Sequence, residues 1–285
     1  MIVITGASGQ LGRLVIAELL KTMPATQIAA AARNPDRVRD LAARGIHVRL
    51  ADYDRAATLD TAFMGADKVL LISSNEVGRR APQHKAVIDA AKRVGVKLLA
   101  YTSILHADTS PLSLAAEHKD TEEYLKSSGV PFVLLRNGWY TENYTASIPA
   151  ALQHGVFIGS AGSGRIASAA RADYAAAAAA MLIRENQAGK VYELAGDEAY
   201  TLADLAAEVS RQSGKTIPYK NLTEAEFKAA LLGAGLPEGF AELLANSDIG
   251  ASKGGLFDDK RQLSQLIGRP TTPLSSLVKM ALSAS

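Results

Sequence analysis

The chain has 285 residues, of which 48% are hydrophobic and 21% are charged, a balance typical of a globular protein with a sizeable core. This composition excludes a mainly disordered, collagen-like or coiled-coil protein. The formal net charge of +2, from 31 basic and 29 acidic side chains, is too small for a dedicated nucleic-acid-binding protein, so the expected partners are small molecules and not nucleic acid.

Short apolar runs rich in Val, Ile and Leu predict six strands in the first half of the chain. The runs lie at residues 2–5, 27–32, 46–50, 68–72, 97–101 and 131–135. Between them, apolar residues at spacings of three and four, such as Leu11, Val15 and Leu19, predict helices. Strands that are apolar nearly throughout are buried on both faces, and strands that alternate with helices form parallel sheets. The predicted architecture is α/β, with a doubly wound parallel sheet.

The pattern changes after about residue 140. A loop-rich stretch follows, with Gly155, Gly159, Gly162 and Gly164. Helical patterns then predominate over residues 202–244, and residues 190–194 look like a further strand that could return to the sheet. We therefore predict a first domain of residues 1–140 and a smaller C-terminal α/β lobe of residues 141–285, with later segments returning to the first domain.

The first six residues contain no basic segment, and their apolar run is too short for a signal peptide. We therefore expect the protein to be cytoplasmic. The sequence has no window of about 18 consecutive apolar residues, the length that a spanning helix needs. Even residues 175–183 predict only a short alanine-rich helix, so no membrane insertion is expected.

A glycine-rich segment lies between the first predicted strand and the first predicted helix. It reads Gly6-Ala7-Ser8-Gly9-Gln10-Leu11-Gly12. Gly6 permits a tight turn, Gly9 lets the backbone approach a pyrophosphate, and Gly12 lets the helix lie close to the sheet. The amino end of the helix then faces the phosphates. Glycines also make ordinary turns, but the strand before and the helix after predict a dinucleotide-binding loop over these seven residues.

The end of the second predicted strand indicates which dinucleotide binds. An NAD site offers a carboxylate to the ribose 2′-hydroxyl at this place, whereas here Ala29–Ala32 is followed by Arg33. An arginine can pair with a 2′-phosphate, which predicts NADP (NADPH) as the cofactor, the alternative being a solvated arginine. Asp52, after the third strand, could bond an adenine amino group or form a turn.

Three small polar residues, Ser73, Ser74 and Asn75, follow the fourth predicted strand. Ligands of doubly wound sheets bind beyond the carboxyl ends of the strands. These residues are therefore predicted to line the path of the ribose and phosphates, although small polar residues also form ordinary loops.

Two kinds of catalytic site are not predicted. The five histidines have no metal-ligand spacing, and the chain has no cysteine, so we expect no metal, disulfide or cysteine nucleophile. The histidines are His47, His84, His106, His118 and His154. No Gly-x-Ser-x-Gly segment occurs, and Ser163, between two glycines, lacks the preceding strand of a nucleophile elbow, which argues against a hydrolase.

The segment Thr5 to Gly12 resembles the Thr-Gly-x-x-Gly-x-x-Gly motif of extended and atypical short-chain dehydrogenases/reductases. The Tyr-x-x-x-Lys pair of that superfamily is missing, because Tyr101 lies within or at the end of the fifth strand, four residues before Leu105. The following helix carries His118 and Lys119 with no tyrosine beside them. The usual proton relay therefore cannot be transferred to this chain.

What remains resembles the NmrA-like atypical branch, most closely its bacterial type 2 NAD(P)H:quinone oxidoreductases, with the triphenylmethane reductases as near relatives. The resemblance runs essentially end to end. Its most specific segments are residues 72–74, 79–84, 101–103, 135–144 and 251–255. It implies a Rossmann-type domain that binds NADPH, and reduction of a quinone by two electrons without flavin or metal. It also implies a substrate site between that domain and the small lobe.

The loop after the sixth strand offers amide and phenol groups at the edge where the nicotinamide should sit. We assign to the cofactor site Asn137, Gly138, Trp139, Tyr140, Thr141 and Glu142. Asn143 and Tyr140 are the candidate catalytic residues, as donors to the quinone oxygen, with His118 and Lys119 next in line. Trp139 and Tyr140 offer flat surfaces to an aromatic substrate, the alternative being ordinary packing. Because a quinone accepts hydride readily, positioning and a few donors can suffice without a tyrosine acid.

Two other functions are compatible with the sequence. An NmrA-like redox sensor would bind the dinucleotide without turning it over. A sugar-nucleotide epimerase or dehydratase ranks last, because the Tyr-x-x-x-Lys pair is absent. The sequence does not identify the physiological acceptor, and it is compatible with an oligomer.

Overall fold

The computed structural model describes residues 1–284, in which the chain divides into two compact units. The first unit contains Met1–Ala107, Ala116–Asn137 and Arg171–Tyr192. The second contains Asp108–Ala115, Gly138–Ala170 and the chain from Glu193 onward. The chain therefore passes between the two units several times.

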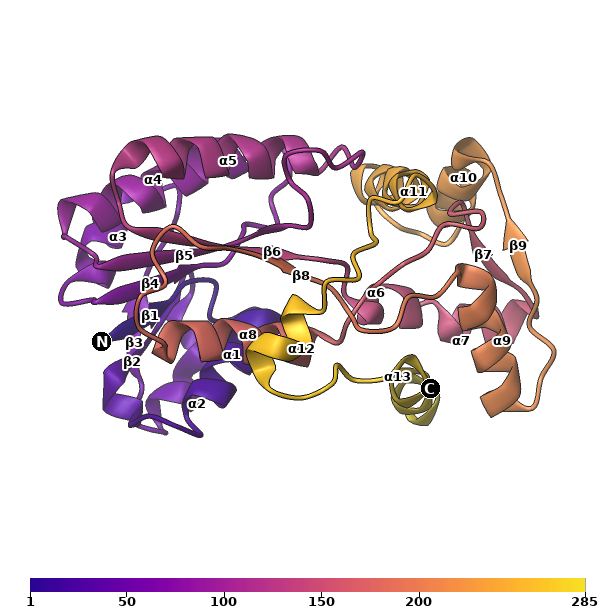
Figure 1. The fold of residues 1–285 in the computed structure, drawn as a ribbon, viewed down its shortest axis with the longest axis horizontal. Helices are drawn as coiled ribbons and strands as arrows, with labels where there is room; N and C mark the ends of the chain where they lie inside the picture. Colours follow the sequence, from indigo (N-terminus) through magenta and orange to yellow (C-terminus); the bar gives the residue numbers. More distant parts are fainter. Residues whose placement is uncertain (285) are drawn as a thin grey trace. The chain divides into compact units, whose positions relative to one another are not determined.

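Seven strands form one sheet in the order β3-β2-β1-β4-β5-β6-β8 (Figure 1). The strands are β1 (Ile2–Ile4), β2 (Ile28–Ala32), β3 (His47–Leu50), β4 (Lys68–Leu71), β5 (Leu98–Ile104), β6 (Phe132–Asn137) and β8 (Val191–Leu194). All neighbouring pairs from β3 to β6 are parallel. The first six strands coincide with the six apolar runs, so the predicted doubly wound parallel sheet is confirmed.

Strand β8 joins the sheet beside β6 and runs in the same direction. Leu134 donates its N–H to the Lys190 carbonyl at 3.0 Å, and Gly138 donates to the Leu194 carbonyl at 2.7 Å. Both strands advance by four residues between these bonds, which is the signature of a parallel pair. The predicted return of residues 190–194 to the sheet is confirmed.

Helices cover both faces of the sheet in the first unit (Figure 1). One face carries α3 (Ala56–Phe63), α4 (Arg80–Arg93) and α5 (Ala115–Ser128). The other carries α1 (Gln10–Leu19), α2 (Arg39–Ala42) and α8 (Arg171–Ile183). Two short 3-10 helices, η1 (Ala25–Gln27) and η2 (Pro35–Val38), lie before and after β2. This layering leaves the carboxyl ends of the strands as the edge at which ligands of such sheets bind.

The core under α3, α4 and α5 is built from apolar side chains of strands and helices. Phe63, Ile88, Leu99 and Leu134 have no exposed surface. Burial of each such side chain stabilises the fold by roughly 1.5 to 3 kcal/mol. The rigid platform that results fixes the positions of the loops at the carboxyl edge.

The second unit is mainly helical and contains a two-stranded parallel sheet of β7 (Phe157–Gly159) and β9 (Tyr219–Asn221). Its helices are α6 (Thr141–Thr145), α7 (Ile148–His154), α9 (Leu202–Ser213), α10 (Glu224–Gly233), α11 (Glu238–Ser252), α12 (Gln262–Ile267) and α13 (Leu274–Ser283). Capping boxes begin α9, with Thr201 and Asp204, and α10, with Thr223 and Glu226. The helical pattern of residues 202–244 is confirmed as three helices, but β9 between the first two was not predicted.

Among residues 1–284, no helix combines the length and the apolar composition of a transmembrane span.

Candidate dinucleotide-binding site

The glycine segment forms the turn from β1 into α1. Gly6 has a φ of +59°, in the left-handed region that favours glycine. Gly9 donates its N–H to the Gly6 carbonyl at 2.9 Å and is the N-cap residue of α1. A Cβ on Gly12 would lie 2.6 Å from the Gly6 carbonyl oxygen. The helix can therefore approach the turn this closely only with glycine at position 12.

The amino end of α1 is suited to an anion. Within residues 1–284 no side chain caps it, and its first turn has no acidic residue. Gly9 and Gln10 are exposed, whereas Ala7 and Leu11 are buried. The N–H groups at a helix start and the positive end of its dipole favour a group such as a pyrophosphate.

Arg33 follows β2, and its side chain is 65% exposed. Its guanidinium donates to Glu76 Oε1 at 2.5 Å, and Glu76 Oε2 also accepts from Arg79 at 3.1 Å and from Gln83 at 3.0 Å. The bond from Arg33, followed by that from Gln83, holds the pKa of the Glu76 carboxyl below its usual value. Glu76 is absent from the predicted site, because no sequence spacing relates the end of β2 to the loop after β4.

Asp52 forms a turn after β3. One of its carboxylate oxygens accepts the Asp54 N–H at 3.1 Å, and its own N–H donates to Thr58 Oγ1 at 2.9 Å. The turn-forming role is thus present, and the adenine contact stays a prediction.

The loop of Ser73, Ser74 and Asn75 follows β4. The Ser73 N–H donates to Thr102 Oγ1 at 2.9 Å, and the Ser74 N–H donates to His84 Nε2 at 3.0 Å. Ser73 and Ser74 are partly exposed, and Asn75 is exposed. Buried partners thus hold the backbone, while the side chains stay accessible at the carboxyl edge of the sheet.

A buried polar group connects α4, β5 and α5. The Tyr101 hydroxyl lies 2.7 Å from His118 Nδ1, and Arg80 Nη1 lies 3.3 Å from His118 Nε2. Burial, and then the charge of Arg80, lowers the pKa of His118 well below its usual value. His118 is therefore neutral at physiological pH, whereas Lys119 lies 4.0 Å from Glu123 at the surface.

Asn137 ends β6 and is only 7% exposed. Its backbone carbonyl accepts the Leu105 N–H at 2.9 Å. Its side-chain oxygen Oδ1 is buried and has no hydrogen-bond partner within residues 1–284. Because an unsatisfied buried acceptor costs free energy, this atom is suited to accept a hydrogen bond from a ligand.

Residues 138–170, directly after Asn137, belong to the second unit. Tyr140 is the N-cap residue of α6 and accepts the Asn143 N–H at 3.0 Å through its carbonyl. Thr141 Oγ1 lies 2.7 Å from Ser168 Oγ. The partly exposed side chains of this segment are Trp139, Tyr140, Glu142 and Asn143. Their contacts with cofactor and substrate stay predictions.

The second unit also buries a carboxyl group, that of Asp248 in α11. It accepts the Ser160 N–H at 2.8 Å and the Tyr144 hydroxyl at 3.3 Å. Burial raises the pKa of Asp248 to about 6, although these two hydrogen bonds oppose the rise.

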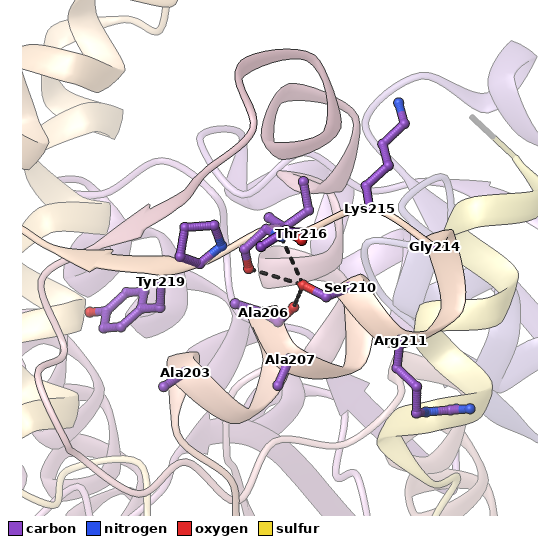
Figure 2. A pocket seen from close by; sticks show the side chains of 11 residues that line it. Ala203, Ala206, Ala207, Ser210, Arg211, Gly214, Lys215, Thr216 and Tyr219 are labelled. Carbon is purple, nitrogen blue, oxygen red and sulfur yellow. Dashed lines mark hydrogen bonds between the residues drawn. The ribbon is translucent and has the colours of Figure 1, made fainter.

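A groove of about 610 Å³ lies in the second unit, along α9 and the segment that leads into β9. Figure 2 shows the side chains that line it. Ala203, Ala206 and Ala207 of α9 are among the residues that line it. Ser210 Oγ lies 2.8 Å from the Ala206 carbonyl oxygen and accepts the Ile217 N–H at 2.9 Å, so it ties the helix to the following segment. None of the predicted site residues lines this groove.

The family model for NAD(P)H-binding proteins matches residues 6–185. The chain belongs to this family. It is 63% identical over 278 residues to quinone oxidoreductase 2 of Escherichia coli (strain K12), covering 98% of this chain and 97% of that protein. A crystal structure of an E. coli NADPH-dependent quinone oxidoreductase complexed with NADPH matches with a TM-score of 0.97 and 62% identity. That match covers 99% of this chain and 100% of the other.

The triphenylmethane reductase of Citrobacter sp., complexed with NADP(H), matches with a TM-score of 0.95 and 38% identity, over 99% of this chain and 100% of that one. These likenesses confirm the resemblance to type 2 quinone oxidoreductases and triphenylmethane reductases. The range matched by the NAD(P)H-binding family begins at Gly6 and includes Arg33, Ser73–Asn75 and Asn137. It therefore spans all the cofactor-site residues predicted in the first unit.

Proposed function

We propose that this protein is an NADPH-dependent oxidoreductase that transfers a hydride to a quinone or a similar planar aromatic acceptor. The observation that carries the proposal is the start of α1. Its open amino end, with Gly6, Gly9 and Gly12 in the turn, forms a site for a dinucleotide pyrophosphate. The 63% identity to an E. coli quinone oxidoreductase, along nearly the whole length of both chains, supports the choice of acceptor.

The residues of the first unit fit NADPH in three places. The glycine turn is suited to the pyrophosphate, and the exposed guanidinium of Arg33 is suited to the 2′-phosphate. The buried Oδ1 of Asn137 is an acceptor for the carboxamide of the nicotinamide. We assign the remaining cofactor contacts to Ser73, Ser74 and Asn75 and to residues 138–142.

When bound, NADPH supplies a hydride, and a quinone that receives this electron pair and two protons becomes a hydroquinone. The hydride would bring both electrons and one of the two hydrogens, so only one further proton is needed, and it can come from water. Asn143 and Tyr140 would donate hydrogen bonds to the quinone oxygen as negative charge develops on it. His118 is not suited to protonate the product, because its buried imidazole is neutral at physiological pH.

The test is to mix the purified protein with NADPH and a small quinone and to follow the absorbance of the reduced cofactor. We expect oxidation of NADPH that depends on both the protein and the quinone, with NADH a poorer donor. Activity should need no added flavin, because the hydride can pass directly between stacked rings. Binding of NADPH without any turnover would overturn the enzyme assignment and favour a redox sensor.

The finer assignments are part of the same proposal. We propose that the protein is cytoplasmic, since a chain without cysteine forms no disulfide and so needs no oxidising compartment. We propose no nucleic-acid partner, because the formal net charge is only +2. Sedimentation of the purified protein would establish whether it forms an oligomer.

A further inference from the structure

The backbone of the loop after β4 is held by side chains from other elements. Ser74 donates its N–H to His84 Nε2 at 3.0 Å and accepts from Arg80 Nε at 2.6 Å through its carbonyl. The neighbouring Ser73 N–H donates to Thr102 Oγ1 at 2.9 Å. Loop backbone groups are usually solvated, whereas His84, Arg80 and Thr102 are all buried. The path of this loop is thus fixed from inside the fold.

The hydrogen bonds of His84 define its tautomer. Nε2 accepts from Ser74 and so carries no proton, which leaves the proton on Nδ1. Nδ1 then donates to Thr121 Oγ1 at 2.9 Å, and that hydroxyl donates to the Glu117 carbonyl at 2.9 Å. The donors therefore run in one direction, from the Ser74 backbone to α5, and each has an acceptor.

The imidazole of His84 has little freedom to change this arrangement. It has no exposed surface, and the rings of Tyr101 and Tyr53 meet it edge-on at centroid distances of 5.4 and 6.4 Å. Burial, and then the charge of Arg80, lowers the pKa of His84 to about 3, so the ring is neutral at physiological pH. Its role is therefore to accept a hydrogen bond from the Ser74 backbone N–H and not to exchange protons with a substrate.

We propose that His84 is a positioning residue for the dinucleotide: its Nε2 atom fixes Ser74, and through it the loop of Ser73, Ser74 and Asn75, in the conformation that receives the cofactor. This inference rests on the proposed function, which assigns that loop to the cofactor site. The alternative is that His84 is only a well-packed core residue, in which case its loss lowers stability and leaves cofactor affinity unchanged.

Two substitutions separate these roles. In His84→Gln the side-chain oxygen reaches about as far as Nε2 and can still accept from Ser74. In His84→Asn the amide lies at the level of Nδ1, where it can still reach Thr121 but not Ser74. Both variants lose the ring and its contacts with the two tyrosines, so they form a matched pair for packing.

Two measurements are made on the full-length wild type and on each variant: the dissociation constant of NADPH by direct titration, and hydrogen exchange of the Ser74 amide without cofactor. We expect His84→Asn to weaken NADPH binding by about tenfold, the upper range for one net hydrogen bond, and to speed exchange of the Ser74 amide. With His84→Gln, both should stay within about twofold of the wild type. In the His84→Asn enzyme the KM for NADPH should rise while kcat at saturating cofactor changes little.

Equal losses of NADPH affinity in the two variants, or unchanged affinity in His84→Asn with fast Ser74 exchange, would overturn the inference. Should a His84 variant fail to fold, Thr121→Val tests the same proposal, because it removes the hydroxyl that accepts the hydrogen bond from His84 Nδ1. Without an acceptor for its Nδ1 proton the imidazole loses its preference for the observed tautomer, so Ser74 exchange and the NADPH dissociation constant should both rise, and unchanged values contradict the inference. A wild type that does not bind NADPH refutes the proposed function instead. The exchange of the Ser74 amide, which is measured without cofactor, still shows whether His84 holds the Ser74 backbone.

Discussion

One arginine carries the cofactor preference that we propose, and the structure gives it a partner of opposite charge. Arg33 lies at the end of β2 and its guanidinium contacts Glu76. The sequence predicts the arginine, because the end of the second strand is a position defined by the motif. It cannot predict the glutamate, because the loop after β4 meets the end of β2 only in the folded sheet.

Replacing Arg33 by alanine should weaken NADPH binding by about tenfold and leave NADH binding nearly unchanged, because only NADPH has a 2′-phosphate to pair with the guanidinium. Titration of both cofactors against wild type and variant measures this. Arg39→Ala is a suitable control, since Arg39 is an exposed arginine that pairs with Asp36 three residues away. Equal losses for NADPH and NADH would show that Arg33 does not recognise the 2′-phosphate.

Glu76→Gln should strengthen NADPH binding by about threefold, because Arg33 no longer has to leave a carboxylate in order to meet the phosphate. The gain is small, since exposed ion pairs contribute only about 0.2 to 1 kcal/mol and the Arg33 side chain is largely exposed. The titration used for Arg33 applies, with salt concentration held fixed. Weaker binding by the variant would mean that Glu76 itself contacts the cofactor.

The candidate catalytic residues Asn143 and Tyr140 should act on turnover more than on cofactor binding. If a hydrogen bond from Asn143 strengthens as charge builds on the quinone oxygen, Asn143→Ala should lower kcat by about tenfold, with a smaller loss for Tyr140→Phe. Steady-state kinetics with a small quinone and a direct NADPH titration separate the two effects. Wild-type turnover in both variants would move the catalytic donors elsewhere.

The central strands β1, β2, β4 and β5 of the large sheet are predictable because they are mainly apolar runs between polar loops. The edge strand β3 is weaker as a pattern, since it includes His47 and Arg49 and none of its residues is fully buried. Strands β7 and β9 were not predicted, since each has only three residues and two of the three in β9 are exposed. The glycine turn is predictable because each of its glycines meets a local requirement of the strand-to-helix motif: the tight turn, the approach of the pyrophosphate or the packing of the helix on the sheet. The contacts of His84 with Ser74 and Thr121 are not, because they join three elements through pairings that no periodicity encodes.

The close approach of α1 to the glycine turn leaves no room for a side chain at Gly12. In Gly12→Ala the new Cβ would lie 2.6 Å from the Gly6 carbonyl oxygen and 2.8 Å from the Ala7 Cα, both backbone atoms that cannot rotate away. The helix must shift, so the free energy of unfolding should fall by about 1 to 3 kcal/mol and NADPH binding should weaken strongly. Denaturant unfolding and cofactor titration measure the two effects.

The control for Gly12 is Gly239→Ala in α11. A Cβ at Gly239 meets nothing within 4 Å, and alanine is favoured over glycine inside a helix by about 0.5 to 1 kcal/mol. This variant should therefore be as stable as the wild type or slightly more stable, with unchanged NADPH binding. A Gly12→Ala variant that behaves in the same way would show that α1 tolerates a side chain at this contact.

Buried titratable groups in both units make the free energy of unfolding depend on pH. His84 has its pKa lowered to about 3 and His118 well below its usual value, both mainly by burial. In the unfolded chain a histidine binds a proton below about pH 6.5, so on acidification below this pH the unfolded state gains protons that the folded state does not. Asp248, with its pKa raised to about 6, acts in the opposite direction, since the folded state binds its proton first.

Between about pH 6 and 4.5, unfolding lets His84 take up about one proton; His118 adds to this uptake, and Asp248 offsets part of it. The free energy of unfolding should therefore fall on acidification through this window, with His84 contributing roughly 1.4 kcal/mol for each pH unit, and level off above pH 7, where the histidines are neutral in both states. Urea unfolding at a series of pH values measures the slope. In His84→Gln the contribution of His84 is gone, so the decline in this window should be shallower by roughly 1.4 kcal/mol for each pH unit. A variant whose free energy of unfolding has the same pH slope as that of the wild type would show that His84 is not held neutral by the fold.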